Sequence, residues 1–328
     1  MGVVRYVVTG ATGFIGGHVA RLLLGRGDEV VAIVRSPDRA RDLEEAGAEL
    51  VRGDVTDKES MRAAMDGADG VFHLAAWYEV GTDDSVAEAV NVGGTRNVLE
   101  LVDEESIPRA VYTSTLAVNS DTNGRIVDES YRYDGPHLTT YDRTKWDAHY
   151  RVAEPMMDEG LPLTIVMPGV TYGVGDTSPM RAIWEGYLTR SLPVVPRQTA
   201  YCFGHVEDTA RAHIQAMDRG DPGGTYIIGG HPATLTEVLD VAEDVVGIPA
   251  PRSVSPRWFR LLSRVAGAVE GVVTLPPDYR SESLRVLGGT TYLGDNGKAT
   301  RELGLEHRPF DEGLCDYLEW EMERTGGD

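Results

Sequence analysis

Residues 9–16 read TGATGFIG, and this stretch joins an apolar run to the first helical pattern of the chain. Its glycines follow the spacing GxxGxxG: Gly10 permits a tight turn, Gly13 lets the backbone approach a pyrophosphate, and Gly16 lets the helix pack closely on the strand. Because a helix N-terminus offers free N–H groups and a favourable dipole, the stretch predicts a dinucleotide site rather than a purely structural turn. Six residues are expected to bind the dinucleotide: Gly10, Thr12, Gly13, Phe14, Ile15 and Gly16.

Outward from this turn, apolar runs alternate with helical patterns through the first half of the chain. EVVAIV at 29–34 and LTIVM at 163–167 are continuously apolar, as expected for strands of a parallel sheet buried on both faces. The alternation predicts an α/β fold with a Rossmann-type doubly wound parallel sheet. We expect strands at residues 3–9, 29–34, 48–52, 70–74, 109–114 and 163–167, and helices at 14–26 and 37–46.

After Tyr172 the alternation loosens, and proline-marked loops separate the helical patterns. These patterns lie at residues 206–217, 235–246, 258–270 and 310–323. They predict a smaller, mostly helical C-terminal lobe that binds the substrate. The expected division places residues 1–172 in a dinucleotide-binding domain, with 201–230 returning to it, and residues 173–200 and 231–328 in the substrate lobe.

The composition excludes several classes of protein. The 328 residues carry a formal net charge of −21, which disfavours nucleic-acid binding because phosphate would be repelled. No run of about 18 apolar residues occurs, so stable membrane insertion is not expected. Two cysteines without a metal pattern favour a reducing cytoplasm.

Lysine is nearly absent from the chain. It occurs only at Lys58, Lys145 and Lys298, beside 52 acidic residues. This balance resembles proteins of salt-loving organisms, in which salt screens the repulsion between acidic groups. We therefore expect folding to need high salt, and the alternative is a merely acidic protein.

The residues after the second expected strand indicate the type of cofactor. An NAD site commonly has an acidic residue there, which bonds the ribose hydroxyls, whereas this chain has Val34, Arg35 and Ser36. No carboxylate is present to repel a 2′-phosphate, and the planar guanidinium of Arg35 can pair with one. We expect Arg35 and Ser36 to favour NADP(H), with NAD(H) as second choice; the alternative is a solvated surface arginine.

YDRTK at residues 141–145 is a YxxxK sequence. On a helix, Tyr141 and Lys145 share a face, and a nearby cation lowers the pKa of a tyrosine from its ordinary value of about 10. The pair therefore predicts a general acid/base. A carbonyl substrate also needs a hydroxyl donor, and YTST at 112–115 ends an expected parallel strand, where ligands bind in such sheets. Thr115 is the candidate donor and Ser114 its rival, while a simple cap or turn is the alternative.

These motifs occur in the order typical of a known family. TGATGFIG, GDVTD (53–57), FHLAA (72–76), NVGGT (91–95), YTSTLAV (112–118), YDRTK (141–145), MPGVTYG (167–173) and HVEDTARAH (205–213) span most of the chain. The chain resembles an extended short-chain dehydrogenase/reductase of the NAD-dependent epimerase/dehydratase superfamily, and it is most similar to the dihydroflavonol-4-reductase-like branch. The resemblance implies an NAD(P)-dependent oxidoreductase that interconverts a carbonyl and an alcohol.

The resemblance also implies roles for individual residues. Asp54 and Val55 would contact the adenine, Ala75 and Ala76 would pass close to the nicotinamide side of the cofactor, and Lys145 would also bind the ribose of the nicotinamide. Family position further assigns Pro168 and Val170 to the nicotinamide end, Asn91 to sheet order or a proton relay, and Trp77, Tyr78, Thr115, His137 and Tyr172 to the substrate pocket.

Two departures from the family pattern bear on function. Thr115 stands where the family usually has serine, and residues 167–173 lack the asparagine that sugar epimerases commonly place there. The leading hypothesis is therefore an NADPH-dependent carbonyl reductase. The alternatives are a nucleotide-sugar epimerase or dehydratase with bound NAD, and a non-catalytic regulator that senses dinucleotide. The retained YxxxK pair argues against the regulator.

Weaker signals complete the set of expectations. His73 lies in an apolar run and is expected to be a core histidine. His205, Glu207, Asp208 and His213 suggest a metal site, but acidic residues at a helix start complement its dipole, so no metal is expected. Residues 258–273, with three arginines on or beside them, predict a lid or wall of the substrate pocket, or alternatively a helix on a membrane surface. The resemblance implies a homodimer through helices at 83–105 and 138–158.

Overall fold

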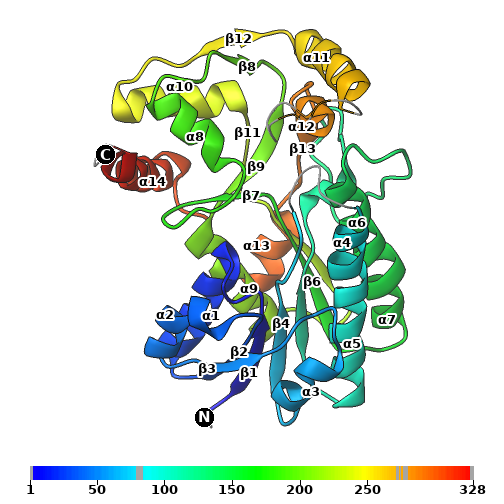
Figure 1. Ribbon diagram of the computed structural model, residues 1–328. Coiled ribbons are helices and arrows are strands. Elements are labelled where there is room, and N and C mark those ends of the chain that lie inside the picture. The colour runs from blue at the N-terminus through cyan, green and yellow to red at the C-terminus, as the bar shows by residue number, and fades with distance from the viewer. Residues whose placement is uncertain (1–2, 79–83, 271–272, 274, 276–279, 326–328) are drawn as a thin grey trace.

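The computed structural model describes residues 3–78, 84–270, 273, 275 and 280–325. Among these residues, seven strands form one parallel sheet in the order β10-β6-β5-β4-β1-β2-β3 (Figure 1). The strands of this sheet are β1 (Arg5–Thr9), β2 (Glu29–Val34), β3 (Glu49–Arg52), β4 (Gly70–His73), β5 (Ala110–Thr113), β6 (Leu163–Pro168) and β10 (Thr225–Ile228). The expected strands are confirmed to within two residues at each end.

Helices cover both faces of the sheet, so the predicted doubly wound α/β fold is confirmed. Apolar side chains of α1 (Phe14–Arg26), α9 (Val206–Arg219) and α13 (Gly297–Leu303) pack on one face. Those of α3 (Glu59–Met65) and α5 (Thr95–Glu104) pack on the other. Burial on both faces explains why the central strands are apolar throughout rather than alternating.

The strand order places a crevice where the site is expected. β1 pairs with β2 on one side and with β4 on the other. The strands that follow β1 are thus added first on one side of it and then on the other, so the strand order reverses at β1. Ligands of open α/β sheets bind at the carboxyl ends of the strands beside such a point. The residues that follow β1 and β4 are the glycine turn and the segment of Ala75, Ala76 and Trp77.

A second lobe sits above this edge of the sheet (Figure 1). Its short strands form a four-stranded sheet around β9 and a two-stranded sheet, which the expectation of a mostly helical lobe did not include. The strands are β7 (Val170–Tyr172), β8 (Val194–Pro196), β9 (Ala200–His205), β11 (His231–Thr234), β12 (Arg252–Val254) and β13 (Thr291–Tyr292). The helices are α8 (Arg181–Leu188), α10 (Leu235–Val246), α11 (Pro256–Val269), α12 (Ser281–Val286) and α14 (Phe310–Thr325).

The two lobes interleave along the chain. β9 belongs to the upper sheet, whereas α9 and β10, which follow it, pack on and join the lower sheet. α13 lies inside the range expected for the substrate lobe, yet it packs against α9 and β10. The residue boundaries expected from the sequence stay a prediction.

Three expected helices are interrupted. Residues 37–46 form a short 3-10 turn, Pro37–Arg39, and α2 (Arg41–Glu45), because the Ala40 backbone leaves the helical conformation. α4 (Asp84–Ala87) continues through a π-helical segment, Glu88–Gly94, into α5. α6 (Thr140–Ala148) continues through a second π-helical segment, His149–Ala153, into α7 (Glu154–Asp158). These two long helices lie side by side, and the dimer expected there stays a prediction.

Candidate active site

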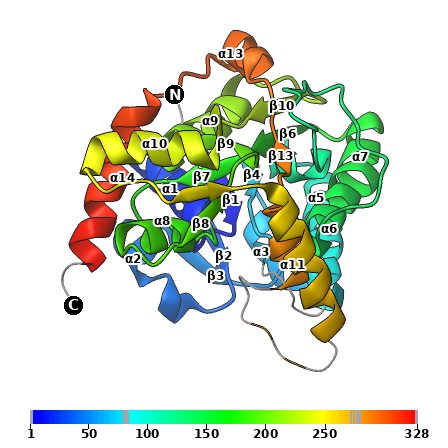
Figure 2. The same cartoon turned by 90° about the horizontal axis from the view of Figure 1, so that it is seen from above.

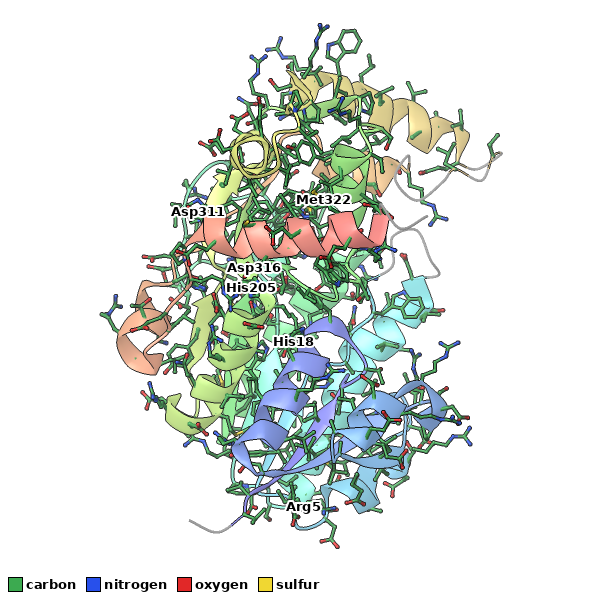
Figure 3. The ribbon with its side chains drawn as sticks, turned by 90° about the vertical axis from the view of Figure 1, so that its left-hand side faces the viewer. Arg5, His18, His205, Asp311, Asp316 and Met322 are labelled. Atoms are coloured by element: carbon green, nitrogen blue, oxygen red, sulfur yellow. The ribbon has the colours of Figure 1, made fainter. Side chains whose placement is uncertain are left out.

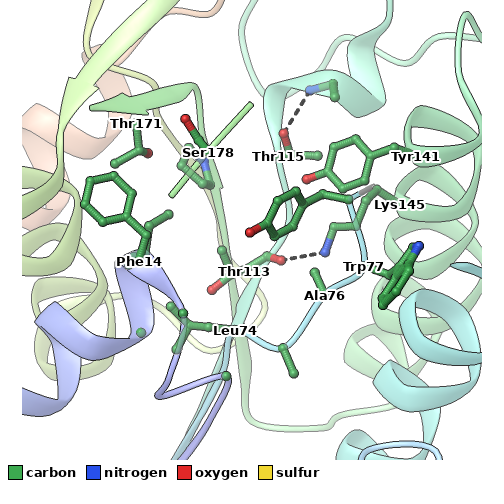
Figure 4. A pocket seen from close by; sticks show the side chains of 18 of the residues that line it. Phe14, Leu74, Ala76, Trp77, Thr113, Thr115, Tyr141, Lys145, Thr171 and Ser178 are labelled. Carbon is green, nitrogen blue, oxygen red and sulfur yellow. Dashed lines mark hydrogen bonds between the residues drawn. The ribbon is translucent and has the colours of Figure 1, made fainter. Parts of the chain in front are cut away.

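A cavity of about 600 Å³ lies between the carboxyl edge of the large sheet and the upper lobe. It is lined by residues from both lobes, and Figure 4 shows its central part. The lining includes these residues predicted from the sequence: Gly10, Thr12, Gly13, Phe14, Ile15, Gly16, Arg35, Asp54, Val55, Ala75, Ala76, Trp77, Tyr78, Thr115, Tyr141, Lys145, Pro168 and Val170.

The glycine turn forms one end of the cavity. Gly10 has a left-handed φ of 73°, and a Cβ atom on it would lie 2.6 Å from the amide nitrogen of Ala75. A Cβ atom on Gly16 would lie 2.2 Å from the carbonyl oxygen of Gly10. Gly13 occupies the N-cap position of α1, which therefore has no side-chain cap, and the first turn holds no acidic residue. This start leaves backbone N–H groups for an anion and therefore fits a pyrophosphate.

The end of the cavity that the sequence assigns to the adenine lies beyond β2. Arg35 is exposed there and forms no ion pair with a residue that the structure describes. The carboxylate of Asp54 accepts hydrogen bonds from the amide and hydroxyl of Thr56, at 2.9 and 2.8 Å. Ser36 lies directly before the 3-10 turn at Pro37–Arg39 and is not part of the cavity lining; its part in cofactor binding stays a prediction.

Tyr141 and Thr115 meet at the centre of the cavity (Figure 4). Thr115 follows β5, and its Oγ1 accepts a hydrogen bond from the amide of Ala117 at 3.2 Å. Tyr141 lies in the first turn of α6, where Thr139 caps the helix. The two residues line the same part of the cavity, and the nearby Thr115 hydroxyl partly offsets the raised pKa of Tyr141. The end of a strand and the start of a helix thus bring two hydroxyl groups to the same cavity.

Lys145 lines the same cavity but is bonded elsewhere. Its Nζ donates to the hydroxyl of Tyr112 at 3.0 Å and to the carbonyl oxygen of Thr113 at 2.8 Å. Burial lowers the pKa of Lys145 to about 7 and raises the pKa of Tyr141 to about 12. The expectation that Lys145 lowers the pKa of Tyr141 is wrong for this structure, because the cost of burying a phenolate outweighs any help from an amine that is itself buried.

A buried polar chain continues behind Lys145. The ring of Tyr112 stacks on that of His73, and the Thr95 hydroxyl lies 3.0 Å from Nε2 of His73. Nδ1 of His73 lies 2.8 Å from the hydroxyl of Thr9. Burial lowers the pKa of His73 to about 3, so the ring is neutral and satisfied in the core, as expected.

Ser114, the rival donor, is held by another partner. Its hydroxyl lies 2.7 Å from Nδ1 of His149 and the residue is buried, although it borders the cavity. Thr115 is therefore the hydroxyl that meets Tyr141.

Three further predicted residues lie outside the cavity lining. Asn91 is buried in the π-helical segment, where its amide holds the backbone of Trp77 and the hydroxyl of Thr144 at 2.7 to 2.9 Å. It thus positions a cavity residue and α6 rather than facing the reacting atoms. His137 packs between Tyr133 and Trp146.

Tyr172 is the third predicted residue that lies outside the cavity lining. It is only 1% exposed and packs edge-on against three rings of the upper lobe, so it belongs to the core and not to the pocket wall. The three rings are those of His205, Phe310 and Tyr317.

His205, Glu207 and Asp208, at the start of α9, each have partners within the fold. His205 lies beneath α14 (Figure 3), and its ring caps α9 by accepting from the amide of Glu207. Arg308 pairs with Glu207 and Asp208. Among the described residues, no group of three or more histidine, cysteine or acidic side chains is arranged to hold a metal ion.

The upper lobe supplies cavity residues that the sequence did not single out. They are Met180, Tyr201, Val286 and Tyr292, together with Asp142 of α6. The first four lie in segments without a readable motif, and only Asp142, beside Tyr141 in YDRTK, carried a signal. Asp142 accepts hydrogen bonds from Tyr292 at 2.9 Å and from Thr139 at 2.8 Å. Burial raises the pKa of Asp142 to about 7.

Asp142→Asn is expected to stabilise the protein most at neutral and higher pH. Below pH 3.8, the ordinary pKa of an aspartate, Asp142 is protonated in both the folded and the unfolded protein. Between pH 3.8 and about 7 it is protonated only in the folded protein. The wild type therefore loses stability over this range, by an amount on the order of 2–4 kcal/mol. Urea unfolding of both proteins from pH 4 to pH 8 checks this. A difference between them that stays constant with pH would contradict it.

The comparisons with known proteins agree with this geometry. The model described as "NAD dependent epimerase/dehydratase family" matches residues 6–229. A protein of Synechocystis sp. named after dihydroflavonol 4-reductase is 31% identical over 325 residues, which cover 96% of this chain and 94% of that protein. The 4-hydroxy-2-methyl-3-oxo-4-farnesyl-3,4-dihydroquinoline-1-oxide ketoreductase of Stigmatella aurantiaca is 30% identical over 314 residues, which cover 93% and 92%.

A solved structure shares the fold. The dTDP-glucose 4,6-dehydratase DesIV of Streptomyces venezuelae, with NAD and TYD bound, has a TM-score of 0.78 at 23% identity, with 98% of each chain covered. Relatives of the reductase kind and of the epimerase/dehydratase kind thus both resemble this chain. The family match, the sheet order and the cavity together show that the chain belongs to the NAD dependent epimerase/dehydratase family, the extended short-chain dehydrogenases/reductases, and is an oxidoreductase acting on CH–OH groups.

Proposed function

We propose that the protein is an NADPH-dependent reductase that converts a ketone or aldehyde to an alcohol. The observation that carries this proposal is that Thr115 and Tyr141 line the same cavity as the glycine turn. The two hydroxyls can bind one carbonyl oxygen, and the turn can hold a pyrophosphate at the other end.

Three residues of the cavity have separate roles in the proposed reaction. Thr115 orients the carbonyl oxygen, and Tyr141 gives it a proton as the alcohol forms. The raised pKa of Tyr141 keeps its proton in place at neutral pH, which suits a donor. Lys145, which lines the same cavity, is the residue proposed to bind a ribose hydroxyl. When bound, a reduced nicotinamide supplies the hydride.

The substrate proposed is a bulky apolar carbonyl compound. Trp77, Met180 and Val286 line the cavity beside aromatic residues of the upper lobe, and apolar walls suit an apolar ligand. The Stigmatella relative, whose name contains a farnesyl-bearing ketone, supports this choice.

The test is a screen for NADPH oxidation over ketones, aldehydes, sterols and flavonoid-like compounds at high salt. Turnover that is lost in Tyr141→Phe supports the proposal. Protein that purifies with tightly held NAD and consumes no NADPH would indicate an epimerase or dehydratase instead. Dinucleotide binding without turnover of any substrate in the screen would favour a sensor.

Arg35→Asp is expected to reverse the cofactor preference. The arginine can pair with a 2′-phosphate, so its replacement weakens NADPH binding by about tenfold or more, while NADH binding is kept or improved. Titration of both cofactors by nicotinamide fluorescence checks this. Arg39→Asp is the matched control, because Arg39 is exposed nearby but does not line the cavity. Equal affinity of the wild type for both cofactors would refute the assignment.

A further inference from the structure

Helix α11 exposes a continuous apolar stripe. Five residues at helical spacing are each between 39% and 62% exposed: Trp258, Leu261, Leu262, Val265 and Val269. The opposite side of the helix is buried, with Phe259 and Ala266 packed against Leu284 of α12. Because single exposed apolar residues are ordinary, the informative feature is that five of them form one stripe.

A row of arginines lies beside this stripe. Arg257, Arg260 and Arg264 are exposed, and at 3.6 residues per turn they form a third face, roughly 120° from both the stripe and the buried face. Arg260 donates to the carbonyl oxygen of Gly288 at 2.7 Å. None of the three forms an ion pair with a residue that the structure describes.

The charge of this region is opposite to that of the protein. The chain has 52 acidic residues among 328 and a net charge of −21, yet residues 245–269 contain four arginines and no acidic residue. The next acidic residue, Glu270, is held by the amide and hydroxyl of Ser281 at 2.6 and 2.7 Å. α11 is thus a basic, apolar face on an otherwise acidic molecule.

The stripe does not face the active-site cavity. No residue of α11 lines that cavity, and α12, which contributes Val286 to the lining, packs directly against α11. α11 therefore lies outside the cavity wall, at the rim of the upper lobe (Figure 2), and the expectation of a lid or wall of the substrate pocket is wrong for this helix.

We propose that α11 docks the protein on the surface of an anionic lipid bilayer. An amphipathic helix of this kind lies in the plane of the interface, with its apolar stripe among the acyl chains and its arginines at the phosphates. A second copy of the chain fits the face less well, because an isologous contact would bring the two arginine rows together. None of the described helices has the length and apolarity needed to cross a bilayer, so the contact is peripheral.

The experiment measures binding to vesicles. The full-length protein is sedimented with vesicles of pure phosphatidylcholine, and with vesicles in which a third of the lipid is phosphatidylglycerol, at the lowest KCl concentration that keeps it folded by circular dichroism. We expect partitioning onto the anionic vesicles to be at least tenfold stronger. Leu261→Asp should remove most of this binding, and Arg257→Glu with Arg264→Glu should remove its dependence on phosphatidylglycerol.

A matched control and a spectroscopic readout complete the test. Ile126→Asp changes a residue that is 57% exposed outside α11, and it should bind like the wild type. Vesicles should shift the tryptophan emission of the wild type to the blue, and Trp258→Phe should lose that shift. Equal binding of Leu261→Asp and the wild type would overturn the proposal. So would a dimer in light scattering that Leu261→Asp dissociates, without any binding to vesicles.

Discussion

Tyr141→Phe is expected to abolish turnover, by about 10³-fold or more, while dinucleotide affinity changes little. The substitution removes one oxygen and keeps the ring, so the packing of α6 is preserved. Thr115 can still bind the carbonyl oxygen, but the phenol proposed as the proton donor is gone. Steady-state kinetics with any substrate found in the screen, together with a dinucleotide titration, checks this result.

Tyr131→Phe is the matched control for that substitution. Tyr131 lies outside the cavity lining and contacts the guanidinium of Arg125 through its ring, so the control should keep full activity. Thr115→Val should lower kcat as well, but less severely than Tyr141→Phe, because the proton donor remains. Retained activity in Tyr141→Phe would refute the role of this residue.

Gly16→Ala is expected to weaken dinucleotide binding by about tenfold to 100-fold, since losing one hydrogen bond to a charged phosphate costs about 1.5–3 kcal/mol. Its Cβ atom would lie 2.2 Å from the carbonyl oxygen of Gly10, and neither atom belongs to a flexible side chain. α1 must therefore move away from the turn, which misplaces the N–H groups at the helix start. Titration by fluorescence and a thermal melt measure the two consequences.

Gly25→Ala separates this effect from a general loss of stability. Gly25 lies in the same helix, and a Cβ atom there would meet nothing within 4 Å. Alanine should stabilise α1 at this position by up to about 1 kcal/mol and leave binding unchanged. If Gly16→Ala does not fold, Gly13→Ala serves instead, because its Cβ atom would lie 3.1 Å from the same oxygen and requires a smaller shift. Normal binding by both turn variants would contradict the assignment of the phosphate site.

The sequence predicted the parallel sheet and the dinucleotide end of the site well. Continuous apolar runs at β2 and β6 marked buried strands, and the glycine spacing marked the turn. These features are local, because the strand period and the glycine requirement are each encoded within about ten residues. The interruption of the expected helix at Ala40 was missed, because alanine is not a residue type that breaks helices.

The substrate end of the site was predicted poorly. Met180, Tyr201 and Val286 come from separate segments of the upper lobe, and only the packing of short strands brings them to the cavity. His137 and Tyr172 were assigned by position along the chain, but both pack into neighbouring aromatic clusters. The exposure of the α11 stripe could not be inferred either, because its spacing is equally typical of a core helix.

The amino-acid sequence by itself determined the sheet, the phosphate-binding turn and the pairing of a tyrosine and a lysine on one helix face. Only the tertiary structure decided that Lys145 donates to Tyr112 and Thr113, that Tyr141 meets Thr115, and that Asp142 is buried. The physical reason is that protonation depends on desolvation and on partners distant in the chain. Lys145 and Tyr112, for example, are 33 residues apart, and no local pattern records that contact.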